Sequence, residues 1–260
     1  MASTPAGPEP RTSMLGRATA ILDAFGPGED ALALAELTRR CGLPKPTVHR
    51  LAVELAELGL LDRDEHGYRL GVRLLELGQR SWWQRELRDR AVPFLETLRR
   101  QTHRGVNLAV LSGSEVVYLE GLAEPDSGPS RVGSRLPAHT TALGKAILAF
   151  SPAAALREVV AAGLPRAGPR TITAPRLLTR ELVRVRTEGV AVDVEESHSG
   201  MLCAASAVFD GSGRPVASLS VSGCGTVVQL RKLGPLVRAA AGGLSRRLAS
   251  SPNLAIPEQR

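Results

Sequence analysis

Three helix-forming runs, separated by Gly and Pro, occupy the first part of the sequence and restrict its fold strongly. Residues 14–25 place apolar side chains at helical spacing and stop at a Gly-Pro-Gly sequence. A second helical run covers residues 33–40, and after the short link GLP a third covers residues 45–58. Two short helices joined by a tight turn that contains Gly form a helix-turn-helix unit, whose second helix enters the major groove of DNA. The pattern therefore predicts a DNA-reading unit.

The residues that follow change from helical to strand spacing. Residues 60–63 and 68–71 read as two short strands, and the polar sequence DEHG between them reads as a turn. A hairpin placed directly after the recognition helix is a wing. A plain three-helix unit with a solvated surface hairpin is the alternative, but the order and lengths of the elements favour a winged helix-turn-helix domain over residues 12–73.

Charge is informative here through its position and not through its total. The chain carries a formal net charge of +7, yet the first 73 residues hold nine basic and ten acidic side chains and are nearly neutral. Between Glu36 and Glu54 there is no acid, and this stretch contains Arg39, Lys45 and Arg50. Phosphates must be neutralised where contact occurs, so this local basic stripe is the predicted DNA-facing surface.

The start of the predicted recognition helix supplies the candidate contacts. Pro46 falls in the first helical turn, where its missing N–H costs nothing. Arg50 is the preferred base contact because its guanidinium can pair with guanine, whereas Lys45 and Thr47 suit phosphate. The residues predicted to bind DNA, including one in the wing, are Arg39, Lys45, Pro46, Thr47, His49, Arg50 and Arg69.

The rest of the chain predicts a linker helix over residues 74–88 and an α+β domain over residues 89–250. The domain begins with a helix over 91–101, with Pro93 in its first turn. Mixed strands and helices follow, as expected of an antiparallel sheet covered by helices. The expected strands are 106–111, 116–122, 202–209 and 215–222, and the expected helices are 142–150, 153–161, 177–188 and 227–248. Residues 251–260 are expected to form a tail.

Several classes of protein are disfavoured by composition. Apolar stretches are broken before the roughly 18 residues that a membrane helix needs. Residues 1–11 lack an apolar segment and are expected to be a disordered leader, which makes the cytoplasm the expected location. The cysteines Cys41, Cys203 and Cys224 are widely spaced, without a CxxC pair, so we expect no disulfide framework, no metal site and no cofactor.

Two regions of the sequence resemble one known family. The stretch from GLPKPTVHRL to YRLGVRLLELG resembles the DNA-binding segment of the IclR family of bacterial transcription regulators. The stretch RLPAHTTALGKAILA, together with residues 189–223, resembles the signatures of that family's ligand domain. The resemblance covers about residues 15–248 and implies a GAF-like C-terminal domain that binds a small effector.

The resemblance also implies an effector site. Residues that match the family's pocket are Asp193, Cys203, Ser220 and Ser222, and the loop around Gly133 is expected to contribute. Strand alternation places the two serines on one face, with the cysteine opposite them across a hairpin. Thr140 and Thr141 precede the helix expected over residues 142–150, and their hydroxyls can cap its start. Hydroxyls, a thiol and a carboxylate beside a helix start suit a small organic or aromatic acid.

We therefore expect a regulator that binds a DNA operator and a small-molecule effector, as a homodimer or a dimer of dimers. A repressor and an activator are both compatible with the sequence. One alternative is a thiol-dependent enzyme in which Cys203 is the nucleophile and His198 or His139 the base. A second alternative is a winged-helix protein that binds other proteins and not DNA.

Overall fold

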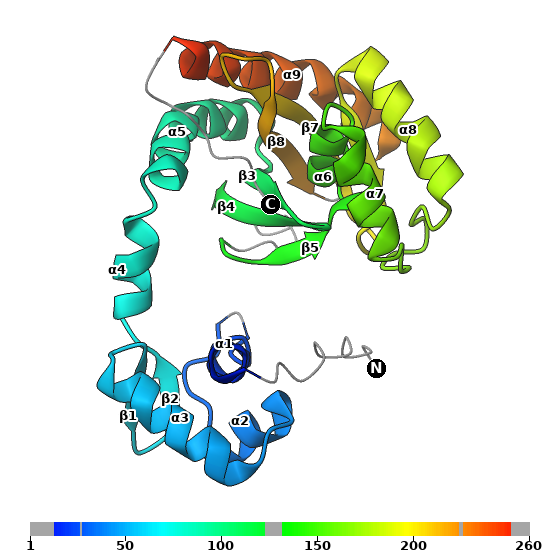
Figure 1. The fold of residues 1–260 in the computed structure, drawn as a ribbon. Coiled ribbons are helices and arrows are strands. Elements are labelled where there is room, and N and C mark those ends of the chain that lie inside the picture. The colour runs from blue at the N-terminus through cyan, green and yellow to red at the C-terminus, as the bar shows by residue number, and fades with distance from the viewer. Residues whose placement is uncertain (1–12, 27, 123–131, 224–225, 251–260) are drawn as a thin grey trace. The chain divides into compact units, whose positions relative to one another are not determined.

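The computed structural model describes residues 13–26, 28–122, 132–223 and 226–250. The expected leader, the expected tail and Cys224 lie outside the described residues. The chain divides into two units, residues 1–82 and 83–260, each with its own core (Figure 1). Within the described ranges, no helix is both long and apolar enough to cross a membrane.

The N-terminal unit is a winged helix-turn-helix. Its elements are α1 (Met14–Leu22), α2 (Leu34–Cys41), α3 (Lys45–Glu57), β1 (Leu61–Asp64) and β2 (Gly67–Leu70). Each helix contributes to one apolar core, through residues such as Ile21, Leu37 and Leu51. Gly42 ends α2 in the left-handed conformation, with φ of 64°, which turns the chain toward α3. The predicted helix-turn-helix is therefore confirmed.

The wing is fixed to the segment before α2. Strands β1 and β2 pair antiparallel, and Leu32 forms an isolated bridge with Tyr68. Gly67 has φ of +131°, and a Cβ at this position would lie 2.4 Å from the carbonyl oxygen of Leu32. Only glycine allows this approach. The hairpin is thereby held against the helical core.

The connecting region differs from the prediction. Its helices are α4 (Arg73–Gln79) and α5 (Trp82–Thr102). The expected linker helix 74–88 is broken at Arg80 and Ser81, and the helix expected to begin at residue 91 is part of α5. Pro93 lies inside that helix, at a cost of about 3 kcal/mol. Packing outweighs this cost, because α5 buries one continuous stripe: Leu87, Ala91, Leu95 and Leu98.

The C-terminal unit is built on an antiparallel sheet in the order β5-β4-β3-β8-β7-β6. The strands are β3 (Gly105–Ser112), β4 (Glu115–Leu122), β5 (Arg135–Pro137), β6 (Ala191–Val194), β7 (Leu202–Phe209) and β8 (Pro215–Gly223). The two predicted hairpins, β3–β4 and β7–β8, meet through pairing of β3 with β8. The short edge strands β5 and β6 were not predicted, because three or four residues carry too little alternation to be recognised.

Helices cover both faces of this sheet (Figure 1). They are α5 and the elements η1 (a 3-10 turn, Ala138–Thr140), α6 (Ala142–Leu148), α7 (Ala153–Ala161), α8 (Pro175–Glu188) and α9 (Val227–Ala249). Strand β3 shows the division, since Val106, Leu108 and Val110 pack with α5 and α9 while Ala109 packs on the side of α6 to α8. The predicted α+β architecture with an antiparallel sheet is confirmed.

Close backbone packing brings α6 against the sheet. A Cβ on Gly144 would lie 2.2 Å from the carbonyl oxygen of Ala138, so the glycine of the GK sequence lets α6 fold back on η1. Thr141 caps the helix, as predicted, and its hydroxyl accepts a hydrogen bond from the N–H of Gly144 at 3.0 Å. This packing places the first turn of α6 over strands β3, β7 and β8.

Candidate effector site and DNA-binding surface

Five of the seven predicted DNA-contacting residues lie on α3, while Arg39 lies on α2 and Arg69 on β2. The apolar face of α3 is buried, with Val48 and Leu51 in the core of the N-terminal unit. Lys45, His49 and Arg50 are exposed on the other face. Pro46 is also exposed and lies in the first turn, as predicted, while Thr47 is half-buried. The helix thus presents four of its five predicted contact residues to solvent and Thr47 in part.

Most of the predicted basic residues are ion-paired within the N-terminal unit. Arg50 contacts Glu54 at 2.9 Å one turn along α3, and Arg69 pairs with Asp64 in the wing. A phosphate that binds to these arginines must compete with the carboxylates they already contact. Because Lys45 has no ion pair among the described residues, it is the cation most available to a phosphate.

The basic residues of α2 are held even more tightly. Arg39 contacts Glu36 at 2.6 Å, and Arg40 contacts both Glu29 at 2.6 Å and Glu36 at 2.7 Å. Hydrogen bonds from Arg39 and then Arg40 lower the pKa of Glu36 to about 2. Residues 37–53 contain no acid, but the positive charge of this basic stripe is partly neutralised by Glu29, Glu36 and Glu54, which lie outside it in the sequence.

A small cavity opens in the C-terminal unit between the sheet and the first turn of α6. Its volume is about 160 Å³. One wall is apolar and includes Leu136, Leu143 and Met201. The other wall is polar, with side chains from β3, β6, β8, the turn after β6 and the cap of α6: Asn107, Thr141, Asp193, Ser197, His198, Ser220 and Ser222.

Four of the five predicted effector residues meet at this cavity. Asp193, Cys203, Ser220 and Ser222 all line it. Strand register explains the grouping, because Cys203 lies opposite both Asp193 on β6 and Ser222 on β8. The fifth, Gly133, is not among the lining residues. It stands before β5 with φ of +85°, and its N–H donates to the carbonyl of Tyr118 at 2.8 Å.

Asn107 is a site residue that sequence reasoning missed. It is buried on β3, directly opposite Ser220 on β8. Its amide nitrogen donates to the hydroxyls of Ser220 at 3.4 Å and Ser222 at 3.3 Å. Asn107 alternates with the apolar residues that define β3, so a polar residue inside a buried strand was the available signal. Tyr118 on β4 also lines the cavity and was not predicted either.

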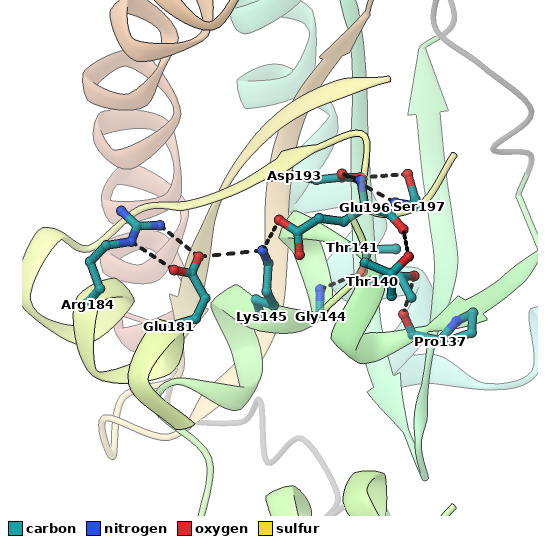
Figure 2. A network of polar contacts seen from close by, with 11 residues as sticks. Pro137, Thr140, Thr141, Gly144, Lys145, Glu181, Arg184, Asp193, Glu196 and Ser197 are labelled. Atoms are coloured by element: carbon teal, nitrogen blue, oxygen red, sulfur yellow. Dashed lines mark hydrogen bonds and ion pairs between the residues drawn. The ribbon is translucent and has the colours of Figure 1, made fainter. Parts of the chain in front are cut away.

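Asp193 holds a turn that forms the rim of the cavity. Its Oδ1 accepts the N–H of Glu196 at 2.7 Å and the N–H of Ser197 at 3.3 Å, and its Oδ2 accepts the Ser197 hydroxyl at 2.6 Å (Figure 2). Burial raises the pKa of Asp193, and these hydrogen bonds oppose the rise. Three bonds to one carboxylate make Asp193 a brace for residues 194–198 as well as a wall of the cavity.

The chemistry of Cys203 does not support the thiol-enzyme alternative. Burial, reinforced by nearby Asp193, raises the pKa of Cys203 to about 12, so the nucleophilic thiolate is scarcely populated near neutral pH. His139 is also buried, and its Nε2 lies 3.1 Å from the carbonyl oxygen of Pro165. Among the described residues, no group of His, Cys, Asp and Glu could hold a metal ion.

A buried ion-pair network lies behind the turn that Asp193 braces. Lys145 on α6 has no exposed surface, and its Nζ lies 2.5 Å from Oε1 of Glu196 and 3.5 Å from Oε1 of Glu181 on α8. Glu181 also contacts Arg184 at 2.8 Å, which extends the network along α8 (Figure 2). The family resemblance includes the segment that contains Lys145, but no role was predicted for the lysine side chain.

Glu196 is the member of this network whose carboxylate is incompletely hydrogen-bonded. Its Oε2 is buried and has no hydrogen-bond partner within the described structure. Burial raises the pKa of Glu196 to about 7, against the lowering effect of Lys145. The carboxylate therefore changes charge close to neutral pH.

Comparisons with known proteins agree with this geometry. The family model for the bacterial transcriptional regulator IclR C-terminal domain matches residues 79–246, and the model for the IclR helix-turn-helix domain matches residues 14–65. The HTH-type transcriptional regulator XynR of Escherichia coli (strain K12) is 34% identical over 211 residues, which cover 79% of this chain and 84% of the relative. The glycerol operon regulatory protein of Streptomyces coelicolor is 32% identical over 247 residues, 91% and 96% of the respective chains.

A solved structure gives the same result. An IclR homolog from Microbacterium hydrocarbonoxydans, complexed with 4-hydroxybenzoate, superposes with a TM-score of 0.82 at 32% sequence identity. The match covers 92% of this chain and 100% of that chain. A winged helix-turn-helix joined to a sheet domain with a ligand cavity defines a transcription regulator that responds to a small effector, and not an enzyme. The chain belongs to the IclR family of bacterial transcription regulators.

The raised pKa of Glu196 predicts how stability changes with pH. The folded pKa of about 7 exceeds the ordinary 4.5, so the folded state binds this proton more tightly than the unfolded state. The stabilisation is complete below about pH 4.5 and is lost as the pH rises through 7. The free energy of unfolding of the wild type, measured relative to that of Glu196→Gln, should therefore decrease as the pH rises from about 4.5 to about 7. The slope should reach up to about 1.4 kcal/mol per pH unit.

Urea denaturation of both proteins from about pH 5 to about pH 8 measures this difference. Other titrating groups cancel in the comparison, because both proteins contain them. A wild-type advantage that grows with pH would contradict the assignment.

Proposed function

We propose that the effector is a small hydroxy-substituted carboxylic acid, of the size of a hydroxybenzoate, and that it binds in the cavity beneath α6. The observation that carries this proposal is the composition of the cavity wall, where neutral donors from several elements surround one braced carboxylate. Binding of this acid would modulate how the winged domain holds its operator.

Size limits the ligand. The volume of about 160 Å³ is well below the roughly 300–1,000 Å³ of pockets that hold drug-sized molecules. A single aromatic ring or a short aliphatic acid is of the appropriate size. The apolar wall of Leu136, Leu143 and Met201 suits the ring or chain of such a molecule.

Polarity limits the ligand further. The Asn107 amide, the hydroxyls of Ser220 and Ser222, and the first turn of α6 offer donors to a carboxylate, since first-turn N–H groups have no partner within their own helix. Asp193 accepts three hydrogen bonds and retains acceptor capacity for a ligand hydroxyl. The solved relative with 4-hydroxybenzoate supports a ligand of this class.

The proposed DNA contacts are those that α2, α3 and the wing present. Arg50 would contact a base after releasing Glu54, and Lys45 and Thr47 would contact phosphate. Arg39, Pro46, His49 and Arg69 complete the surface. We further propose that the protein acts in the cytoplasm as a homodimer or a dimer of dimers, so that paired winged domains bind the half-sites of a near-palindrome. Effector binding would then shift the populations of DNA-competent and DNA-incompetent arrangements.

Loss of a cavity hydroxyl should weaken effector binding. Ser220 has no exposed surface, so Ser220→Ala removes a polar contact and leaves the Asn107 amide less satisfied. We expect the Kd for 4-hydroxybenzoate, measured by isothermal titration calorimetry, to rise about tenfold. Ser212→Ala, in the exposed β7–β8 turn, is the control and should leave the Kd unchanged. Failure of hydroxybenzoates and short hydroxy acids alike to bind the wild-type protein would refute the proposal.

Substitutions in α3 test the proposed DNA contacts. Arg50→Ala should weaken binding to the intergenic DNA upstream of the protein's own gene by about tenfold or more, measured by fluorescence anisotropy. Glu54→Gln, which releases Arg50 from its ion pair, should bind equally or more tightly. Arg214→Ala, in the C-terminal unit, is the charge-matched control. Unchanged affinity of Arg50→Ala would remove this residue from the interface.

A further inference from the structure

We propose that Lys145 and Glu196 are positioning residues of the effector site. Their ion pair fixes the turn formed by residues 194–198, and so determines where Ser197 and His198 lie against the bound acid. The turn and its support are properties of this chain, whereas the consequence for the ligand rests on the proposed function. Neither residue needs to touch the effector.

The turn is a strained element that depends on external support. Glu195 adopts φ of +58°, a left-handed conformation that is unfavourable for a residue other than glycine. The two residues that follow Glu196 in the turn, Ser197 and His198, both line the cavity. A shift of this segment would therefore move two polar groups of the site together.

Backbone hydrogen bonds from Arg170 and to Met201 hold Glu195, and three further sets of contacts oppose a shift from different sides. Asp193 binds the N–H groups of Glu196 and Ser197 from the cavity side. The hydroxyl of Thr171 donates to the carbonyl of Glu196 at 2.6 Å from the loop before α8. Lys145 binds the Glu196 side chain at 2.5 Å from α6 (Figure 2). Only the third contact connects the turn to α6, the helix whose first turn forms another wall of the cavity.

The burial of Lys145 makes this third contact a fixed link. An ammonium group with no exposed surface must remain paired, because an unpaired charge in the interior is strongly unfavourable. Glu181 shares the charge at 3.5 Å but is anchored on α8 by Arg184, so it does not replace Glu196. The lysine thus holds α6, α8 and the turn in one arrangement.

Hydrogen exchange of the full-length protein tests the positioning role without any ligand. In Lys145→Met the amides of Glu196 and Ser197, which Asp193 binds, should exchange at least tenfold faster than in the wild type. The amides of the β3–β8 pair should keep their protection, which shows that the domain remains folded. Glu86→Gln, which breaks an ion pair with Arg90 on α5, is the control and should leave the turn unchanged. Wild-type protection of the turn in Lys145→Met would overturn the proposal.

A pH series separates positioning from a general loss of packing. The charged groups facing Glu196 are Lys145 on α6, Glu181 and Arg184 on α8, and Asp193 on β6, with His139 of η1 beside Lys145. All remain in Glu196→Gln, so that variant isolates one titration. After correction for intrinsic rates, wild-type protection of the turn should rise severalfold from pH 8 to pH 6, because a pKa of Glu196 raised above its ordinary value means that the closed turn binds this proton more tightly than the open one. Glu196→Gln should show no such step, and a step of equal size in both proteins would contradict the proposal.

The ligand measurement completes the test. The Kd for 4-hydroxybenzoate should rise about tenfold in Lys145→Met and remain unchanged in Glu86→Gln. An unchanged Kd alongside faster exchange of the turn would overturn the link to effector recognition. If 4-hydroxybenzoate does not bind the wild-type protein, the proposed effector class fails, while the exchange experiment still decides whether Lys145 fixes the turn.

Discussion

The buried ammonium group of Lys145 is the constraint on which the C-terminal unit depends. With no exposed surface, it must be surrounded by carboxylates, and these come from α8 and from the turn after β6. Helix α6 reaches this position because Gly144 allows its backbone to fold against Ala138. Three segments far apart in the sequence are thereby brought to one point, next to the cavity that the sheet leaves open.

The proposed effector site follows from this arrangement. Strand pairing of β3, β7 and β8 brings Asn107 beside Ser220 and Ser222, and α6 closes the cavity from above. Asp193 connects the two systems, because its carboxylate lies in the cavity wall and also binds the turn that carries Glu196. The ligand cavity and the buried ion pair therefore share one structural element. A displacement of this turn would disturb the contacts of Lys145 on α6 and Glu181 on α8.

Local sequence patterns were sufficient to predict part of the fold. The winged helix-turn-helix and the two hairpins could be predicted because helical spacing, strand alternation and Gly-containing turns are read within about ten residues. The family resemblance correctly pointed to Asp193, Cys203, Ser220 and Ser222 as neighbours, since all four line one cavity. Their individual roles in binding remain predictions.

Apart from the short edge strands, most of the missed features depend on long-range contacts. Asn107 and Ser220 meet only through the β3–β8 register, and Lys145 finds Glu196 across fifty residues of intervening chain. The continuation of α5 through Pro93 results from packing against the sheet, which overrides the local preference of proline. The ion pair between Arg40 and Glu29 was hidden for the same reason, because Glu29 approaches Arg40 only in the folded unit. The pairs of Arg39 with Glu36 and of Arg50 with Glu54 are instead local, since their members lie about one helical turn apart.

A crystal structure of the protein with 4-hydroxybenzoate would show whether the acid occupies the cavity beneath α6 while Lys145 stays paired with Glu196. We predict density for the acid between Asn107, Thr141 and Ser220, with Nζ of Lys145 still bound to the carboxylate of Glu196. Density for the acid elsewhere in the C-terminal unit, or an occupied cavity with Lys145 turned away from Glu196, would contradict this prediction.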